Sequence, residues 1–319
     1  MTQLSVIIVN YRTPALTLQA LSSLAGELDP ARHRAVVVDN DSRDGSAEAI
    51  EAVIATRGFR AWARVVRARE NGGFSAGNNV GMRAEPAAFH LLMNSDAYVR
   101  PGAIAELLAA AEAHPRAGIL SPRLEGPDGT PQVSCFRDRS PASELIEAAE
   151  TGVVTGLLRR WDVPLPISDV PFEPEWTSFA CVMLRRELIE SIGAMDDGYF
   201  MYFEDIDYCR RARAAGWSVL HWPHARVVHL RGGSSPVKAR MAARERPPLY
   251  YYEARARYFA KFYGRSGLVA TNLLWAVGRT VSGLRERFGR KPAHVCEGTG
   301  RDIWRRCFDP LVPSREATS

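Results

Sequence analysis

The chain has 319 residues, of which 46% are hydrophobic and 24% charged, and this composition excludes a disordered protein and one too small for a sizeable core. The net charge of +5 is unevenly spread, because residues 231–319 carry 18 basic against 7 acidic side chains while residues 1–230 carry 23 against 29. A basic C-terminal part on an acidic body predicts an anionic partner, such as a membrane surface, or a solvated arginine-rich helix face.

Cysteines and apolar stretches indicate the compartment. The five cysteines are scattered without a CxxC pair, which argues against a zinc ribbon or a disulfide framework and for a reducing environment. The N-terminus enters an apolar strand directly and shows no signal peptide. The longest apolar stretch, 267–278, is too short to span a bilayer. We expect a cytoplasmic protein, with peripheral attachment to the inner face of the membrane left open.

Apolar, β-branched runs alternate with helical segments in the first third of the chain. The predicted strands are 4–9, 35–38, 64–67 and 91–93, and the predicted helices are 13–26, 45–57, 74–83 and 101–114. Polar residues gather at the C-terminal ends of these strands. This alternation predicts an α/β fold with a mostly parallel sheet flanked by helices, and a site at the strand ends.

The rest of the chain is less regular. The predicted segments are a turn at 126–129, a loose helix at 140–158, a proline-rich mobile loop at 164–174, strands at 176–184, 218–222 and 226–230, and helices at 186–192 and 204–216. From about residue 244 the chain is helical, basic and aromatic. We expect a main domain over 1–243, divided near residue 120, and a helical extension over 244–319 that is partly disordered from residue 301.

An aromatic run at 200–203 leads into three carboxylates, Glu204, Asp205 and Asp207, which are followed by arginines. Acids in the first turn and bases in the last suit the helix macrodipole, so an ordinary capped helix explains part of this pattern. Carboxylates beside apolar surface are also candidates for proton transfer, because such surroundings shift their pKa.

Two groups at strand ends suggest nucleotide binding. Asn10-Tyr11 and Asp39-Asn40 place an aromatic ring and a carboxylate where they can stack on a base and bind a ribose, although turn and cap chemistry explains 40–42 equally well. Glycines 73, 77 and 81 recur one helical turn apart in 70–81, so this helix can lie close to a diphosphate or to the sheet. The pattern is not GxGxxG, which disfavours a nicotinamide-dependent oxidoreductase.

Asn94-Ser95-Asp96 follows a buried strand, and a carboxylate there is a ready ligand for Mg²⁺ or Mn²⁺. His229, at the end of a later strand, is the candidate for a further ligand. A structural histidine is the alternative reading, and His221 and His224 lie close by in the sequence.

Six segments together resemble family 2 glycosyltransferases, near the rhamnosyltransferase-like subgroup of bacterial cell-surface polysaccharide synthesis. They are VIIVNYRT, VVDNDSRDGS, ENGGFSAGNNVG, LLMNSDAYV, FMYFEDIDYCRRARAAGW and VVHLRGGSS. Each segment is a weak signal alone, but six in this order are specific, and the resemblance covers about residues 3–263.

The resemblance implies a GT-A fold and an inverting enzyme that takes a sugar, with rhamnose favoured, from a dTDP- or UDP-linked donor, GDP being left open. The acceptor would be a saccharide or a polyprenyl-diphosphate-linked saccharide. Residues 1–120 would form the nucleotide-sugar half and 121–243 the acceptor half. The implied donor-site residues are Asn10, Tyr11, Asp39, Asn71, Gly73, Asn78, Asn94, Ser95 and Asp96.

For the chemistry, the resemblance implies that Asp96 and His229 hold Mg²⁺ or Mn²⁺, that Asp205 is the general base, and that Glu204 orients the acceptor or shares the role of base. Asn94 departs from the family pattern, which has an acid there, so strict metal dependence stays open. For the same reason, a degenerate domain that serves as a carbohydrate-binding or scaffold module remains the alternative to an enzyme.

The C-terminal segment mixes aromatic with basic residues. Seven tyrosines and phenylalanines share 249–264 with Arg255, Arg257 and Lys261, followed by an apolar stretch and more arginines. Basic amphipathic helices of this kind lie on anionic membranes. Packing on the main domain or a homodimer interface is the alternative, and we expect no nucleic-acid partner, because no recognised motif for one appears.

Overall fold

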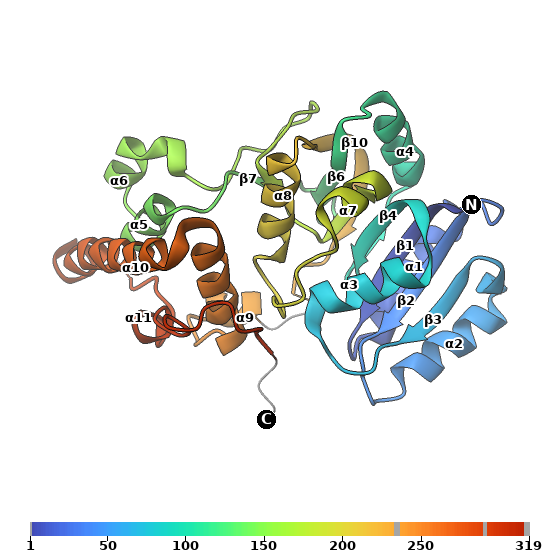
Figure 1. Cartoon of the computed structure of the whole chain (residues 1–319), viewed down its shortest axis with the longest axis horizontal. Helices are drawn as coiled ribbons and strands as arrows, with labels where there is room; N and C mark the ends of the chain where they lie inside the picture. The colour runs from blue at the N-terminus through green and yellow to red at the C-terminus, as the bar shows by residue number, and fades with distance from the viewer. Residues whose placement is uncertain (1, 233–236, 290–291, 316–319) are drawn as a thin grey trace.

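The computed structural model describes residues 2–232, 237–289 and 292–315. Among them, one eight-stranded sheet lies at the centre of an α/β fold, with the strand order β3-β2-β1-β4-β9-β6-β10-β5 (Figure 1). The strands are β1 (Thr2–Asn10), β2 (His33–Asp39), β3 (Ala63–Arg67), β4 (Ala87–Asn94), β5 (Ala97–Val99), β6 (Ala117–Glu125), β9 (Cys181–Arg185) and β10 (Ser218–His229).

The sheet is mixed. Strands β3, β2, β1 and β4 are parallel neighbours, and β6 is parallel to β10. Strand β9 runs antiparallel to both β4 and β6, and β5 runs antiparallel to β10. The predicted mostly parallel sheet is therefore confirmed, and its parallel half carries the polar strand ends that the sequence picked out.

Helices cover both faces because side chains alternate along each buried strand. Leu4, Val6 and Ile8 of β1 pack with α1 (Pro14–Leu24), α2 (Ser46–Thr56) and α4 (Ala103–Ala113). Ile7 faces the other way, into a core that includes Met82, Leu188 and Ile206. The helices on that second face are α3 (Gly73–Ala84), α7 (Arg186–Ile192) and α8 (Glu204–Ala214).

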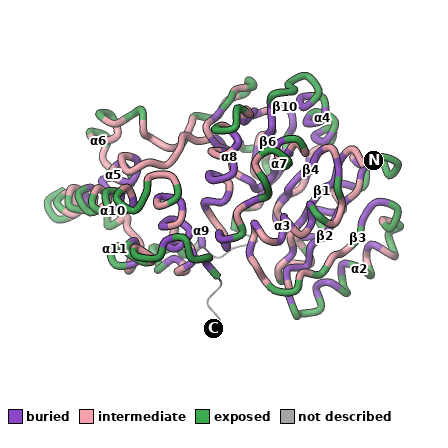
Figure 2. Tube along the Cα trace, in the orientation of Figure 1, coloured by how far each residue is buried: buried purple, intermediate pink, exposed green. Residues whose placement is uncertain are grey.

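The C-terminal part forms a helical layer at the opposite end from β3 (Figure 1). It consists of α9 (Val237–Ala242), α10 (Leu249–Gly289) and α11 (Thr299–Asp302), with α5 (Pro141–Ala149) and α6 (Gly152–Leu157) beside α10. Helix α10 is broken at Gly264, whose φ of 72° is not helical. Figure 2 shows that the first part of α10 is buried, whereas its far end and α6 are largely exposed.

A buried ion pair joins this layer together. The Nη2 atom of Arg255 on α10 lies 2.8 Å from Oε2 of Glu144 on α5, and both side chains are less than 5% exposed. The same guanidinium donates through Nη1 to Asn272 at 2.7 Å, and Arg139 binds the other oxygen of Glu144 at 2.8 Å. Burial alone would raise the pKa of Glu144, but the charges of Arg255 and Arg139 outweigh it and lower that pKa.

Several details differ from the sequence prediction. The two strands expected at 218–222 and 226–230 are the single strand β10, which has an irregularity between Trp222 and Arg226. The loose helix expected at 140–158 is interrupted, because α5 ends at Ala149 and α6 begins at Gly152. The proline-rich segment pairs with other elements at Pro164 and Phe172. A further small sheet joins β7 (Cys135–Phe136) to β8 (Trp176–Thr177).

The sequence predicts a chain end that is partly disordered from residue 301, and the structure describes this end as far as residue 315. After α11, residues 303–315 form turns that pack on the main domain, and Ser314 is only 4% exposed. Its hydroxyl donates to the carbonyl of Gly198 and accepts from the backbone N–H of Phe200. Residues 316–319, and residues 233–235 of the last sequence motif, lie outside the described residues.

Candidate active site

A cavity of about 1180 Å³ opens where β1, β4 and β10 end. Its walls come from the ends of β1, β2 and β4, the start of α3, residues 178–180, the segment 200–205 that leads into α8, the end of β10, and the C-terminal segments 240–253 and 305–315. It contains most of the predicted site residues: Tyr11, Asn71, Gly73, Asn94, Ser95, Asp96, Glu204, Asp205 and His229.

Asp96 and His229 meet because their segments are adjacent. His229 at the end of β10 pairs with Ala97 of β5, and the backbone N–H of Leu230 donates to the carbonyl of Asp96 at 2.9 Å. This pairing brings Nε2 of His229 to 3.6 Å from Oδ1 of Asp96. Both side chains are almost fully buried at the cavity wall, with exposed fractions of 6% and 1%.

These two residues fit a divalent cation that is shared with a substrate. One carboxylate oxygen and one imidazole nitrogen lie close enough together to bind one ion. The described residues contain no group of three or more His, Cys, Asp or Glu that could complete an all-protein site. Mg²⁺ and Mn²⁺ take few protein ligands where substrate phosphates and water supply the rest, so the donor set matches that mode of binding.

Asn94 and Ser95 are fixed by contacts on either side of the cavity. The backbone N–H of Asn94 donates to the carbonyl of Ala180 at 2.9 Å, which continues the antiparallel pairing with β9. The hydroxyl of Thr13 donates to Oγ of Ser95 at 3.1 Å. Thr13 also lines the cavity, and the sequence analysis did not single it out as a site residue.

Asn10, Asp39 and Asn78, three of the predicted donor-site residues, do not line the cavity. Asn10 is fully buried, and its amide donates to Oδ1 of Asp39 at 2.8 Å and to Oγ of Ser42 at 3.1 Å. The amide of Asn78 donates to the carbonyl of Phe74 within α3 at 2.9 Å. In this structure Asn10 and Asp39 brace the loops that carry Tyr11 and Asn40, and Asn78 bonds within its own helix.

Asn40 lines the cavity beside Asn71 and Gly73. Its amide nitrogen donates to Oδ1 of Asn71 at 2.7 Å and to the carbonyl of Gly73 at 3.1 Å. Its own Oδ1 is buried and has no hydrogen-bond partner among the described residues. An unsatisfied buried acceptor is costly, and a ligand donor in the cavity would relieve that cost.

The three spaced glycines of α3 have different roles. Side-chain carbons at Gly77 and Gly81 would collide with Val9 and Ile7 of β1, so these two glycines allow tight packing of the helix on the sheet. Gly73 has a φ of 81°, and a Cβ there would collide with the carbonyl of Phe200. The N–H of Phe74 donates to that same carbonyl at 2.8 Å. The start of α3 is thus fastened to the segment that carries the acidic residues.

The acidic residues at the start of α8 follow a strained turn. Tyr202 and Phe203 have φ values of 75° and 68°, a region that residues with bulky side chains rarely adopt. The helix then begins at Glu204, so Glu204 and Asp205 both face the cavity from its first turn. Strained non-glycine residues of this kind cluster at functional sites.

The environment of Glu204 differs from that of Asp205. Glu204 is 8% exposed, and its Oε2 atom has no hydrogen-bond partner among the described residues. Burial, and then the charge of Asp205, raise the pKa of Glu204 well above its ordinary range. Asp205 is more exposed, and its Oδ1 accepts from the N–H of Ile206 at 2.9 Å. Two neighbouring carboxyls in unlike surroundings can divide the roles of acid and base.

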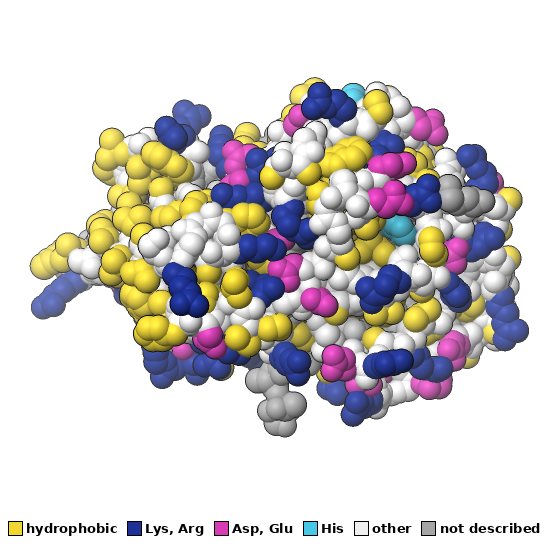
Figure 3. All heavy atoms as spheres, in the orientation of Figure 1, with side chains coloured by type: hydrophobic (Ala, Val, Ile, Leu, Met, Phe, Trp, Pro, Cys, Tyr) yellow, Lys and Arg dark blue, Asp and Glu magenta, His cyan; other side chains and the backbone are white. Residues whose placement is uncertain are grey.

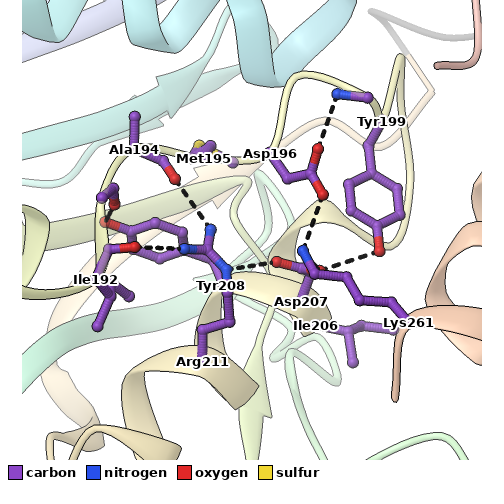
Figure 4. A network of polar contacts seen from close by, with 12 residues as sticks. Ile192, Ala194, Met195, Asp196, Tyr199, Ile206, Asp207, Tyr208, Arg211 and Lys261 are labelled. Atoms are coloured by element: carbon purple, nitrogen blue, oxygen red, sulfur yellow. Dashed lines mark hydrogen bonds and ion pairs between the residues drawn. The ribbon is translucent and has the colours of Figure 1, made fainter. Parts of the chain in front are cut away.

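Asp207, the third acid, points away from the cavity into a network of polar contacts (Figure 4). Its oxygens accept from Nε of Arg211 at 2.7 Å and from the hydroxyl of Tyr199 at 3.1 Å. Lys261 of α10 lies between Asp207 and Asp196. Asp207 therefore holds α8 in place and takes no part in the cavity.

The comparison with protein families matches residues 5–137 to the glycosyl transferase family 2. The matched residues contain β1 to β6, and so all the predicted donor-site residues, whereas the acidic helix α8, His229 and the C-terminal helices lie beyond them.

Two relatives carry informative names. The chain is 32% identical over 150 residues to an N-acetylglucosaminyl-diphospho-decaprenol L-rhamnosyltransferase from Mycobacterium tuberculosis. This alignment covers 46% of the chain and 48% of the relative. It is 27% identical over 219 residues to the low-salt glycan biosynthesis hexosyltransferase Agl10 of Haloferax volcanii, covering 66% and 61%. The chain therefore spans about half the length of the mycobacterial relative it matches.

Solved structures share the fold. GalNAc-T7 with UDP, GalNAc and Mn²⁺ aligns with a TM-score of 0.60 at 13% identity, over 97% of this chain and 57% of that one. Mannosyltransferase PcManGT from Pyrobaculum calidifontis, in complex with GDP-Man and Mn²⁺, aligns with a TM-score of 0.58 at 16% identity, over 97% and 83%. At these identities the likeness shows the fold, and the chain has the predicted GT-A fold.

Five arginines line the cavity opposite the strand ends, and no motif in the sequence marks them as site residues. They are Arg240, Arg246, Arg305, Arg306 and Arg315. The sequence shows an excess of basic residues after residue 231, but their spacing follows no motif, and only the folding of α9, α10 and 303–315 brings these five together.

Proposed function

We propose that this chain transfers a sugar from a nucleoside diphosphate to a saccharide or lipid-linked saccharide acceptor, as part of glycan synthesis. The observation that carries the proposal is the meeting in one cavity of a cation-binding pair, Asp96 and His229, with a pair of unlike carboxyls, Glu204 and Asp205. The match of residues 5–137 to family 2 and the names of the two relatives support it.

The nucleoside end of the donor would lie against Tyr11, Asn40 and Asn71, where an aromatic ring and amide groups line the cavity. Asp96 and His229 would hold Mg²⁺ or Mn²⁺ against the diphosphate. When bound, the cation supplies positive charge for the leaving group. The buried Oδ1 of Asn40 would accept from a base or ribose donor and so gain the partner that it lacks among the described residues.

Asp205 would act as the general base. Its carboxylate takes the proton of the acceptor hydroxyl as that oxygen attacks the anomeric carbon, and the bond from this carbon to the phosphate oxygen breaks. The nucleoside diphosphate leaves with the bonding electron pair. Glu204, kept protonated by burial and by the charge of Asp205, would donate a hydrogen bond to the acceptor and orient it.

Single displacement of this kind inverts the anomeric centre. The family resemblance favours inversion. A retaining double displacement would instead require an enzyme side chain that forms a covalent bond to the sugar. For the donor, we favour dTDP-rhamnose, in keeping with the mycobacterial relative's name, while the structural neighbours were solved with UDP and GDP-mannose.

We also propose that the C-terminal layer contacts an anionic membrane surface peripherally. Hydrophobic side chains gather over α5, α6 and α10 on the face shown in Figure 3, with lysine and arginine at their edges. Among them Leu157 is 80% exposed, Phe288 77% and Val153 73%. None of the described helices is long and apolar enough to cross a membrane, so the contact would lie on the surface.

Flotation with vesicles tests this contact. The chain should float with phosphatidylglycerol-containing vesicles and not with pure phosphatidylcholine, and replacing Leu157 and Phe288 by serine should weaken flotation. If the serine variant instead turns a dimer into a monomer in solution without changing flotation, this face is a dimer interface.

The test of the main proposal combines binding with turnover. Thermal shifts with dTDP, UDP, GDP and NAD⁺, each with and without Mn²⁺, should show a metal-enhanced response to dTDP or UDP. Nucleotide release should then rise when acceptor is added. Nucleotide binding without release would favour the alternative that Asn94 keeps open, a carbohydrate-binding module without turnover. A thermal shift with NAD⁺ and with none of the other nucleotides would overturn the proposal of a transferase.

A further inference from the structure

The wall of the cavity opposite the strand ends is basic. Five arginines line it, whereas the acids of the cavity are Asp96, Glu204, Asp205 and Glu253, and the first three belong to the proposed reaction. The five come from α9, the segment before α10, and the segment after α11, which lie up to 75 residues apart in sequence. Their convergence makes this wall of the cavity basic.

Three of these arginines are held in place by acids of the same layer. Arg246 makes a two-pronged contact with Asp302, through Nε at 2.6 Å and Nη2 at 2.8 Å. The Nε atom of Arg305 lies 2.9 Å from Oε1 of Glu253. Arg306 donates to Asp309 at 2.7 Å. Acids that orient guanidinium groups at a cavity wall leave their remaining N–H donors for a ligand.

Arg240 and Arg315 have no acidic partner in the described part of the chain, and both are exposed. The basic wall therefore carries positive charge that the protein does not neutralise. Guanidinium groups in a cavity bind phosphate in two-pronged geometry, so a phosphate or diphosphate is the ligand whose charge and shape match this wall.

This wall lies on the side of the acidic helix. Ser314, next to Arg315, is bonded to Gly198 and Phe200, just before the strained turn that leads into α8. The rings of Tyr250 and Phe200 are 5.1 Å apart, which fastens the start of α10 to the same segment. The nucleotide side of the cavity, formed by Tyr11 and Asn40, belongs to other elements.

The segment that supplies three of the arginines also exposes apolar side chains. Phe308 is 91% exposed, Leu311 57%, Val312 43% and Trp304 41%, and Val312 also lines the cavity. Such a density of exposed apolar groups within nine residues, interleaved with arginines, matches a ligand that joins an anionic group to an apolar chain.

We propose that Arg240, Arg246 and residues 304–315 form a binding site for an amphiphilic acceptor, in which the arginines take its phosphate or diphosphate and the exposed apolar side chains take its lipid. The inference rests on the proposed function, because it assigns this group to the acceptor and not to the donor. The donor diphosphate binds beside Asp96 and His229, and the acceptor diphosphate binds to the basic wall.

Binding of farnesyl diphosphate to the full chain in metal-free buffer tests the site. Calorimetry should show that farnesyl diphosphate binds more tightly than inorganic pyrophosphate, and that farnesol binds more weakly than either. The double variant R240Q/R315Q should bind farnesyl diphosphate at least tenfold more weakly, because it loses two charge-assisted contacts. Phe308→Ser should weaken farnesyl diphosphate binding and leave pyrophosphate binding unchanged.

Arg60→Gln is the matched control, because Arg60 is exposed, lies outside the cavity and has no acidic partner among the described residues. It should bind all three probes as the unaltered chain does. Equal affinity of the double variant and this control for farnesyl diphosphate would overturn the site. A tenfold loss of UDP–Mn²⁺ binding in the double variant would overturn it too, since the arginines would then serve the donor. Absence of sugar transfer with farnesyl diphosphate binding intact would sink the proposed function and leave the anion site standing.

Discussion

The ammonium nitrogen of Lys261 on α10 lies 2.6 Å from Oδ2 of Asp207 on α8. The same nitrogen lies 2.8 Å from Asp196, in the loop that leads to Tyr199 (Figure 4). One lysine of the C-terminal layer therefore fastens the helix that begins with Glu204 and Asp205. The position of the two candidate catalytic carboxyls depends on a helix that lies beyond the residues matched by the family.

Replacing Lys261 by Gln should destabilise the protein by about 2 kcal/mol, because Asp207 is 1% exposed and would keep only Arg211 as a charged partner. The loss should appear in urea unfolding. Arg67→Gln, which breaks exposed contacts to Glu48 and Glu51, should cost less than about 1 kcal/mol. Equal losses of unfolding free energy in the two variants would show that the Lys261–Asp207 ion pair stabilises the protein no more than an exposed ion pair does.

Asp205→Asn and Glu204→Gln should behave differently. Removing the general base should lower kcat by about 10² to 10⁴-fold and leave nucleotide affinity nearly unchanged. Glutamine resembles the protonated carboxyl that burial and Asp205 favour at Glu204, so Glu204→Gln should retain most activity. Steady-state rates with a fixed acceptor, together with nucleotide titrations, separate the two. A comparable fall in donor affinity in Asp205→Asn would remove Asp205 from the base role.

Asp96→Asn and His229→Gln should weaken nucleoside diphosphate binding in Mn²⁺ by at least tenfold and have little effect without metal, because the two side chains meet at 3.6 Å on the cavity wall. Calorimetric titration with UDP or dTDP, with Mn²⁺ and with EDTA, measures the difference. His221→Gln serves as the control, since His221 contacts Ser121 and Phe172 away from the cavity. Metal-independent losses would point to a structural role for the pair.

Gly73→Ala should cost more than Gly58→Ala, although both glycines have φ values above 70°. Alanine at either position costs about 1 to 2 kcal/mol for the left-handed backbone. At Gly58 no atom lies within 4 Å of the added carbon, whereas at Gly73 that carbon collides with the carbonyl of Phe200. Urea unfolding measures the costs, and Gly73→Ala alone should also weaken nucleotide binding. Similar costs at the two positions would mean that the Phe200 segment moves freely.

Acid should weaken the contact between the C-terminal layer and the main domain at Asp196. Burial by itself would raise the pKa of Asp196, but its hydrogen bonds to Arg257 and Lys261 outweigh burial and lower that pKa to about 2. An ordinary aspartate has a pKa of about 3.9, so the stabilisation is complete above about pH 4 and is lost as the pH falls towards 2.

Comparing the stability of Asp196→Asn with that of the unaltered chain at several pH values checks whether ionised Asp196 stabilises the protein. The asparagine variant should lose stability relative to the unaltered chain above pH 4, and the gap should narrow between about pH 4 and pH 2 in urea unfolding. Asp197→Asn, which changes an exposed neighbour, should show no such narrowing. A constant gap at all pH values would exclude ionisation of Asp196 as its source.

The alternation of strands and helices, and the order of the motifs, predict the parallel half of the sheet and the placement of Asp96, Glu204, Asp205 and His229 around one cavity. The sheet follows from periodicity and from the rule that parallel strands share one polar edge. The joint placement of the four site residues follows from the resemblance to family 2 glycosyltransferases. Three predicted donor residues, Asn10, Asp39 and Asn78, turn out to bond neighbouring groups and lie off the cavity. A strand end fixes where a side chain starts and leaves open whether it faces a ligand or a neighbouring loop.

Long-range contacts account for the rest. Nothing local in the sequence marks Tyr202 and Phe203 for a left-handed backbone. Their distant contacts are the packing of Tyr251 of α10 on both rings and, just before the turn, the hydrogen bond from the N–H of Phe74 to the carbonyl of Phe200. The arginine wall likewise depends on Ser314 reaching Gly198, 116 residues away. Composition shows that the C-terminal part is basic and gives no means of choosing five arginines from its many cations.

The shared cavity has a consequence for how such proteins diversify. The wall proposed for the nucleotide comes from residues 9–96, and much of the opposite wall comes from residues 240–315. Exchange of the C-terminal stretch between relatives would therefore alter one partner of the reaction without redesigning the other. A chimaera that carries a relative's segment from residue 240 onward should have that relative's acceptor specificity and keep its original donor specificity.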